Sequence, residues 1–289
     1  GPDSTALVFL LKKWVKKKKG KLIVLIVDHQ IRNNSFDEAN SVKKYLDIKN
    51  INSLILKISK KNVFEGKMSQ ARKNRFSMMI NYCKKNQIFH LFLGHHYDDN
   101  IETFLLRKTA GSNIEGLNCM QEKTIYHGIQ VLRPLLNFSK KQILHYIRKK
   151  NLKFVQDPSN RDEKYSRVVV RSFLKVNSQH KKDIIQDFKL IKNNYIKYKK
   201  MIFQIFNLIN FEIQKKMIVF ETVKFLNLDI ELQTKFIEII YKFFNPHKPF
   251  LRYKKIVSVL NKLCNTANLS LNIASLKITK NNNFIYFIQ

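Results

Sequence analysis

The sequence predicts an α/β protein, with a parallel β-sheet covered by helices on both faces and a second, mainly helical domain after it. Through the first half of the chain, short apolar runs alternate with helical patterns, which is typical of a parallel sheet with crossover helices. The runs are apolar throughout, as in strands buried on both faces. From about residue 178 to 244 the pattern is helical and lacks glycine. We therefore expect one domain at residues 1–175 and another at 176–289.

The expected elements follow from periodicity and from turn residues. In the first domain they are a strand at 22–27, a helix at 36–46, a strand at 54–58, a helix at 68–85, a strand at 90–93 and a helix that opens within 94–102. Ser139 to Gln142 has the form of a capping box for a helix that ends near residue 150. Near the end of the chain we expect a helix at 252–263 and a hairpin made of 269–279 and 284–288.

The net charge of +33 favours a polyanionic partner and salt-sensitive association. The basic residues are 44 Lys and only 10 Arg, and Arg is the better binder of phosphate. A coding bias toward Lys, Asn and Ile would produce the same surface on any protein. The charge therefore permits nucleic-acid binding without establishing it.

Hydropathy and cysteine usage indicate a reducing compartment and no membrane. No apolar run approaches the roughly 20 residues that cross a bilayer, and no secretory leader is visible. Cys83, Cys119 and Cys264 are widely spaced and form no CxxC pair, which argues against a disulfide framework or a zinc site. We expect a cytoplasmic protein, or one in the stroma or matrix of an organelle of bacterial origin.

The first polar cluster is Gly1-Pro2-Asp3-Ser4, directly before an apolar helical stretch. A glycine-bearing turn at a helix start offers backbone N–H groups and the positive end of the helix dipole to a phosphate. The alternative is that Gly1-Pro2 is a scar from a cleaved tag.

The second cluster, Asp28-His29 with Arg32, follows the strand at 22–27. A carboxylate at the carboxyl end of a parallel strand lies where ligands bind, and it can hold Mg²⁺ or accept a proton. An Asp that merely caps a turn is the competing interpretation.

The third cluster is the most specific, because Asp98, Asp99 and Glu102 are expected in the first turn of one helix beside two histidines. Residues three or four apart share a helix face, so these carboxylates lie close together. Their mutual repulsion is relieved if a metal ion or an ammonium group completes the site. A divalent-metal hydrolase remains the rival, although no further ligand has the right spacing.

Two pairs of arginines complete the candidates. Arg72 and Arg75 lie three apart on an expected helix and are suited to phosphate groups. Arg167 and Arg171 lie four apart after the turn at Asp157 to Asn160, and they either face a nucleic acid or form a solvated basic surface.

In this order, the clusters of residues 1–171 resemble those of the tRNA(Ile)-lysidine synthases. Gly1 to Ser4 match the end of Ser-Gly-Gly-x-Asp-Ser, and Asp28 to Arg32 match Asp-His-Gly-Leu-Arg. Ala71 to Phe76 match Ala-Arg-x-x-Arg-Tyr, and His95 to Thr103 match His-His-x-Asp-Asp-x-x-Glu-Thr. Gly111-Ser112 and Gly116-Leu117 match a glycine loop, and two further segments, Arg133 to Leu136 and Asp157 to Asn160, complete the series. Gln30 stands where that family has glycine, and Ala110, Asn113 and Cys119 replace its Arg, Gly and Gly.

The resemblance implies a Rossmann-like sheet of the adenine nucleotide alpha hydrolase type and a two-step ligation. ATP would adenylate the wobble cytidine of an isoleucine tRNA with a CAU anticodon, and free L-lysine would then displace AMP to give lysidine. The implied roles are ATP and pyrophosphate binding for Gly1, Pro2, Asp3, Ser4, His29 and Arg72, catalysis for Asp28, Asp98 and Arg167, lysine binding for Asp99 and Glu102, tRNA binding for Arg75 and Arg171, and Mg²⁺ binding for Asp28 and Asp98.

Several alternatives stay open at this point. A related tRNA thiolase would need cysteines near the nucleotide, and a non-catalytic RNA-binding protein would keep only the basic surface. A homodimer is compatible with the sequence. With no further carboxyl-terminal domain, we expect the tRNA to be held by a shorter body.

Overall fold

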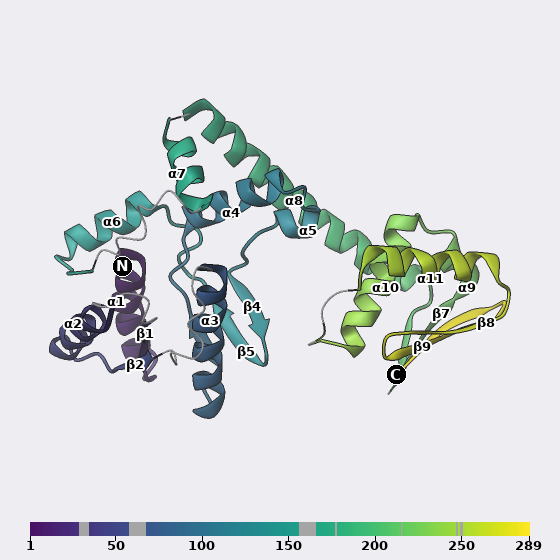
Figure 1. Ribbon diagram of the computed structural model, residues 1–289, viewed down its shortest axis with the longest axis horizontal. Helices are drawn as coiled ribbons and strands as arrows, with labels where there is room; N and C mark the ends of the chain where they lie inside the picture. Colours follow the sequence, from purple (N-terminus) through teal and green to yellow (C-terminus); the bar gives the residue numbers. More distant parts are fainter. Residues whose placement is uncertain are drawn as a thin grey trace. The chain divides into compact units, whose positions relative to one another are not determined.

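The computed structural model describes residues 1–28, 35–57, 68–155, 166–176, 178–214, 216–246, 248 and 251–289. The chain divides into two compact units, residues 1–192 and 193–289 (Figure 1). The boundary expected at 175–176 coincides with the end of helix α7 (Ser166–Val176), whereas the units divide later, inside the long helix α8 (Ser178–Leu208). Each unit is described by itself below.

Unit 1 contains two small sheets built largely from the expected strands. Strand β1 (Val24–Asp28) pairs in parallel with β2 (Ser53–Lys57), and β3 (His90–Phe92) pairs in parallel with β5 (Ile129–Leu132). β4 (Lys123–Tyr126) pairs with β5 in antiparallel fashion through a tight turn at His127 and Gly128, an addition that the periodicity did not predict. Among the described residues, β1 pairs only with β2 and β3 only with β5.

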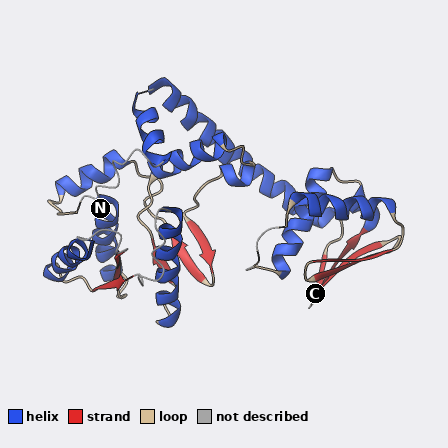
Figure 2. Cartoon of the chain, viewed as in Figure 1, coloured by secondary structure: helices blue, strands red, loops and turns tan. Residues whose placement is uncertain are grey.

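Helices cover both faces of these strands, as predicted. Helix α1 (Pro2–Lys17) packs on α6 (Lys140–Lys149) through a cluster that includes Leu7, Leu11 and Ile143. Helix α3 (Met68–Lys85) packs with Met79 and Ile80 against the strands on the other face. Helix α2 (Ser35–Ile48) packs beside β1 and β2. The helices appear in blue around the red strands in Figure 2.

A third cluster in unit 1 anchors the helix that carries the acidic residues. Helix α4 (Tyr97–Thr109) contacts the short helix α5 (Ile114–Leu117), and it also packs against α7 and the first part of α8. Ile101 and Phe104 of α4 pack against Leu174 of α7 and Phe188 of α8, and the Phe104 and Phe188 ring centroids are 5.4 Å apart. This packing fixes α4 relative to α7, which is the helix that bears Arg171.

Unit 2 is built on a five-stranded antiparallel sheet with the strand order β6-β7-β10-β9-β8. Its strands are β6 (Glu212–Gln214), β7 (Met217–Glu221), β8 (Leu269–Ile273), β9 (Leu276–Lys280) and β10 (Phe284–Ile288). Its helices are α9 (Thr222–Leu226), α10 (Ile230–Phe244) and α11 (Tyr253–Asn265), besides the end of α8. The core includes Phe220, Phe225, Phe236 and Phe287, which are almost wholly buried.

The expectation that residues 178–244 are helical throughout was wrong. The β9–β10 hairpin is present, but β6 and β7 lie inside the segment that we expected to be helical throughout. β7 is apolar and buried at its three central residues. A short apolar run buried on both faces has no period-2 signal, so periodicity does not distinguish it from a buried helical segment.

No helix among the described residues is long and apolar enough to span a membrane.

Candidate active site

Three helices of unit 1 begin at one place, and their first turns are in direct contact. Asp3 lies in the first turn of α1, Asp98 in that of α4, and Lys140 is the first residue of α6. The Lys140 backbone N–H donates to Asp98 Oδ2 over 2.7 Å, and its Nζ lies 2.6 Å and 2.7 Å from the two carboxylate oxygens of Asp3. Each helix N-terminus carries a partial positive charge, so three together favour an anion.

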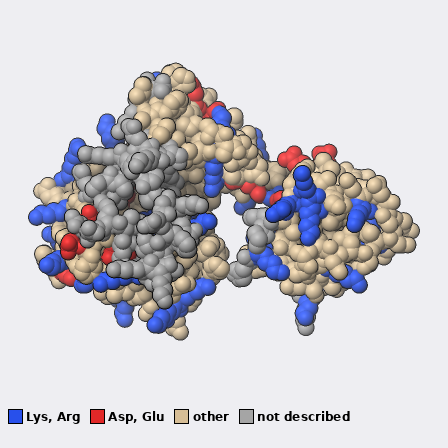
Figure 3. Space-filling view, in the orientation of Figure 1, with Lys and Arg blue, Asp and Glu red and all other residues tan. Residues whose placement is uncertain are grey.

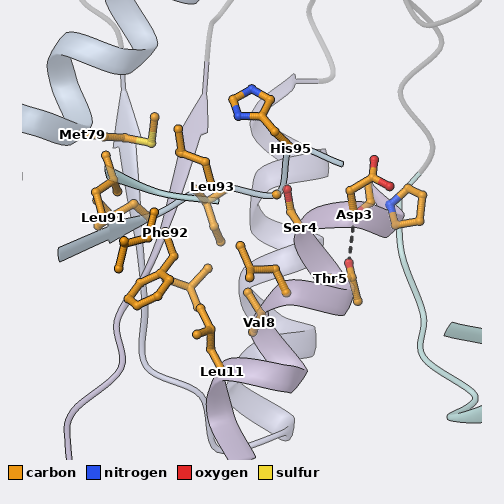
Figure 4. Close-up of a pocket in the computed structure, with 18 of the residues that line it drawn as sticks. Asp3, Ser4, Thr5, Val8, Leu11, Met79, Leu91, Phe92, Leu93 and His95 are labelled. Carbon is orange, nitrogen blue, oxygen red and sulfur yellow. Dashed lines mark hydrogen bonds between the residues drawn. The ribbon is translucent and has the colours of Figure 1, made fainter. Parts of the chain in front are cut away.

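The start of α1 has the form that the sequence predicted for a phosphate cradle. Gly1 is the N-cap residue and Pro2 opens the helix. Proline suits this position, because the N–H that it lacks would have no acceptor within the helix. Ser4 lies directly against the backbone of Gly94, where a Cβ atom would come within 3.1 Å of the Ser4 nitrogen. Figure 4 shows Asp3 and Ser4 at the end of α1 beside His95.

His96 caps helix α4 and lies between the acidic residues. The Asp99 N–H donates to His96 Nδ1 over 3.3 Å, and the His96 N–H donates back to Asp99 Oδ2 over 3.0 Å, which together make a capping box. Because Nδ1 accepts, the ring hydrogen lies on Nε2 in this arrangement. That nitrogen is 3.5 Å from Asp99 Oδ2 and 3.7 Å from Asp3 Oδ1.

The buried pair Asp99 and Glu102 contacts the guanidinium group of Arg171. Arg171 of α7 donates from Nε to Glu102 Oε1 over 2.6 Å, and its second guanidinium nitrogen lies 3.8 Å from Asp99 Oδ1. The pKa of Arg171 is raised, first by the hydrogen bond to Glu102 and then by nearby negative charge, while burial opposes the shift. Glu102 Oε2 is buried and accepts no hydrogen bond from any described residue. This carboxylate pair therefore retains one unfilled acceptor.

A single large cavity, with a volume of about 2030 Å³, joins these groups. Its lining includes Gly1 to Thr5, Gly94 to His96, Asp98, Asp99, Glu102 and Lys140 at the polar end. The apolar end lies between β1 and β3, where Val8 and Leu11 of α1 face the segment of Phe92 and Leu93 (Figure 4). Ordinary small-molecule sites have volumes of roughly 300–1,000 Å³, so the cavity exceeds what one small ligand needs.

The predicted site residues are only partly brought together by the described structure. Gly1 to Ser4, Asp98, Asp99, Glu102, Arg75 and Arg171 all line the cavity. Asp28 is buried at the end of β1 but is not among the described residues that line it. His29, Arg32 and the turn at 157–160 lie outside the described residues, as do the side chains of Arg72 on α3 and Arg167 on α7.

Two details of the sequence interpretation change. Glu102 lies one turn beyond the first turn of α4, which contains only Asp98 and Asp99 as acidic residues, although Glu102 and Asp99 do share a face. Arg171, assigned to tRNA, points its guanidinium into the acidic pair instead of standing on an exposed surface.

The described side chains do not assemble a metal site of their own. No group of three His, Cys, Asp or Glu residues in the described ranges is placed to hold an ion. Asp98 Oδ2 already accepts the Lys140 N–H. Mg²⁺ often binds through one or two carboxylates plus substrate phosphates, so the geometry supports at most an ion that enters with a nucleotide.

Lys140, Gly94 and His96 belong to the site and were not predicted. Lys140 and Asp3 are 137 positions apart, and only the fold brings them together. The signal that could have marked Lys140 was its place directly after Ser139, because the capping box put it at the first position of a helix. Gly94 could have been noticed as a glycine at the end of a strand, where close backbone approach is common.

Comparison with known families identifies the family to which the chain belongs. Residues 1–177 match the family described as the PP-loop domain, which is more than half of the sequence. The chain belongs to the PP-loop family. The match covers the starts of α1, α4 and α6, and it ends just beyond α7.

Several similar proteins carry the same name. The tRNA(Ile)-lysidine synthase of Wolbachia pipientis wMel is 41% identical over 177 residues, which are 61% of this chain and 41% of that protein. The protein of the same name from Orientia tsutsugamushi is 36% identical over 175 residues, which are 61% of this chain and 40% of that protein. The matched PP-loop segment thus spans about two fifths of these relatives.

A solved structure shares the fold. The U34-tRNA thiolase NcsA from Methanococcus maripaludis, solved with its [4Fe-4S] cluster, superimposes with a TM-score of 0.56 at 16% identity and covers 67% of this chain and 69% of its own. At that identity the likeness supports the α/β fold of the PP-loop domain and nothing about its substrate.

Proposed function

We propose that this protein is a tRNA(Ile)-lysidine synthase, which joins L-lysine to the wobble cytidine of the CAU-anticodon isoleucine tRNA at the expense of ATP. The observation that carries the proposal is a buried carboxylate pair, Asp99 and Glu102, in one cavity with three converging helix starts. The helix starts suit a triphosphate, and the carboxylates suit the ammonium group of an amino acid. The relatives of that name support the same substrates.

The reaction requires two transfers. In the first, the 2-carbonyl oxygen of cytidine attacks the α-phosphorus of ATP, and pyrophosphate leaves. In the second, the uncharged amine of the lysine side chain attacks C2, AMP leaves with the former carbonyl oxygen, and the nitrogen loses a proton. Asp98, which lines the cavity, and Asp28 are the carboxylates that we assign to proton transfer, and Arg167 to the substrate side.

The charges of the site agree with this pair of substrates. Asp3, Asp98, Asp99 and Glu102 supply four carboxylates, while Lys140 and Arg171 supply two cations. A cationic amino acid relieves the negative excess, and its ammonium group has an acceptor in Glu102 Oε2. Mg²⁺ entering with ATP would act in the same direction, and we derive no step from it.

The two thiols of unit 1, Cys83 and Cys119, favour a ligase over a thiolase. Burial raises the pKa of Cys119 to about 11, although Arg107 and Lys192 act in the opposite direction. Burial also raises the pKa of Cys83 in α3. Thiolates, not thiols, are the nucleophiles of sulfur transfer, so neither residue is prepared for it near neutral pH.

The test is Glu102→Gln, which keeps the shape of the side chain and removes its charge. We expect the KM for lysine to rise about 10- to 100-fold, which corresponds to the free energy of one hydrogen bond to a charged group. The KM for ATP is expected to change less than about twofold, because Glu102 is not assigned to ATP. Pyrophosphate release is measured with ATP, lysine and a CAU-anticodon tRNA transcript. Asp47→Ala, an exposed carboxylate on α2, is the control. Equal changes in both KM values would remove Glu102 from lysine binding.

A further inference from the structure

Lys140 occupies a position from which one residue contacts two other helix starts, one through its backbone N–H and one through its side chain. Its backbone N–H is held by Asp98 of α4, and its ammonium group lies against both oxygens of Asp3 in α1. The Ser139–Gln142 capping box fixes the helix that begins here, since the Gln142 N–H donates to Ser139 Oγ and the Ser139 N–H donates to Gln142 Oε1. The start of α6 therefore fixes the backbone position from which the ammonium group of Lys140 reaches Asp3.

The ion pair with Asp3 is a poor explanation for a residue in this place. The side chains of Lys140 and Asp3 remain 36% and 25% exposed, and ion pairs with that access to water contribute little to stability. Asp3 is in any case favoured by the positive end of its own helix. The pair has a larger effect on the charge that the cavity presents to a ligand.

A carboxylate in a phosphate cradle works against phosphate binding. Asp3 puts a negative charge into the first turn of α1, where the partial positive charge of the helix would otherwise attract an anion. The ammonium group of Lys140 neutralises that charge at 2.6 Å. A lysine ammonium has three donors, so it can keep a hydrogen bond to Asp3 while it donates to a phosphate oxygen.

We propose that Lys140 is a phosphate-binding residue of the nucleotide site, and that its ammonium group is shared between Asp3 and the phosphates of bound ATP. The inference rests on the proposed function, because it requires ATP at the start of α1. It adds a direct cationic contact from α6, a helix to which the sequence analysis assigned no ligand.

The experiment compares binding of ATP and of adenosine to the full chain, without lysine or tRNA, by calorimetry and competition. For Lys140→Met we expect the Kd for ATP to rise about 10- to 100-fold, as for loss of a hydrogen bond to a charged group. The Kd for adenosine is expected to stay within about twofold, because adenosine has no phosphate. Lys140→Arg restores most of the ATP affinity. Lys141→Met, an exposed lysine one position along α6, binds both ligands like the parent protein.

The outcomes separate the two proposals. If Lys140→Met weakens ATP and adenosine equally, the lysine only supports the structure and the inference fails. It also fails if ATP binding is unchanged. If the parent protein binds ATP through Lys140 but makes no lysidine, the proposed function fails while the role of Lys140 stands.

Discussion

Arg171 is the residue that joins the two sides of the acidic pocket. Through its hydrogen bond to Glu102 it ties α7 to α4, and it balances one of the two charges that lysine is expected to balance. The guanidinium group of Arg171 is thus a cation in contact with the two carboxylates to which we assign the ammonium group of lysine. We expect the ammonium group of lysine to bind beside the guanidinium, at Glu102 Oε2, which accepts no hydrogen bond from any described residue.

Gly94 gives a prediction at the same scale. A methyl group there would lie 3.1 Å from the Ser4 nitrogen and 3.2 Å from the Asp3 carbonyl carbon, both backbone atoms of the α1 start. For Gly94→Ala we expect the first turn of α1 to shift and the ATP affinity to fall several-fold, with a stability loss of about 1 kcal/mol, the low end of overpacking costs. Calorimetry with ATP and a thermal melt measure the two effects.

Gly20→Ala is the matched control, because its new methyl group would meet the Val15 side chain at 3.3 Å, at the far end of α1. Unaltered ATP binding in Gly94→Ala would show that the close approach of β3 and α1 has no bearing on the nucleotide.

The carboxylates could be found from the sequence because they are neighbours in it, whereas their partners could not. Asp98, Asp99 and Glu102 share one short helical motif. Arg171 reaches Glu102 from 69 positions away, and its direction depends on how α7 packs on α4. Local patterns hold no information about such a contact, so the sequence did not predict it; the assignment of Arg171 to tRNA stays a prediction.

At the scale of the elements, sequence patterns were most reliable where local signals agree. Helix α3 has the bounds that periodicity predicts, Met68–Lys85, and α6 begins at the predicted capping box. β6 and β7 were missed, because β7 has a buried apolar centre with no alternation. The pairing of β7 with β10, which closes the sheet of unit 2, joins segments far apart in the chain.

The start of α6 gives a prediction at this scale. Ser139→Ala removes the side chain that accepts from the Gln142 N–H. We expect the free energy of unfolding to fall by about 1 kcal/mol, as is usual for the loss of an N-cap, and ATP affinity to fall with it, because Lys140 is the next residue. Urea denaturation measures the first effect and calorimetry the second. Ser139→Thr keeps the hydroxyl and serves as the control; a Ser139→Ala protein as stable as the Thr variant would contradict the capping role.

At the scale of the whole molecule, the +33 charge is the feature most relevant to tRNA. On the face shown in Figure 3, lysine and arginine side chains are distributed over both units, and acidic side chains are fewer. A basic surface of this kind suits the sugar-phosphate backbone better than a particular base.

We expect tRNA affinity to fall steeply with salt, by at least about 100-fold between 50 and 200 mM, because several phosphates must release their counterions. Filter binding with the CAU-anticodon transcript over a salt series measures the slope. Adenosine binding over the same series is the control, since it involves no phosphate. A flat tRNA response would mean that the lysine content reflects composition alone.

The cavity between β1 and β3 also has a consequence for solubility. Among the described residues each of these strands has a main-chain edge with no neighbouring strand, and both contribute to the same apolar lining. Such edges attract any extended peptide, including one from another copy of the chain. A segment lying between them would bond on both sides and merge the two sheets of unit 1 into one. We expect a segment bound there to reduce self-association through these edges and to make the strands near Gly1 and Gly94 more rigid.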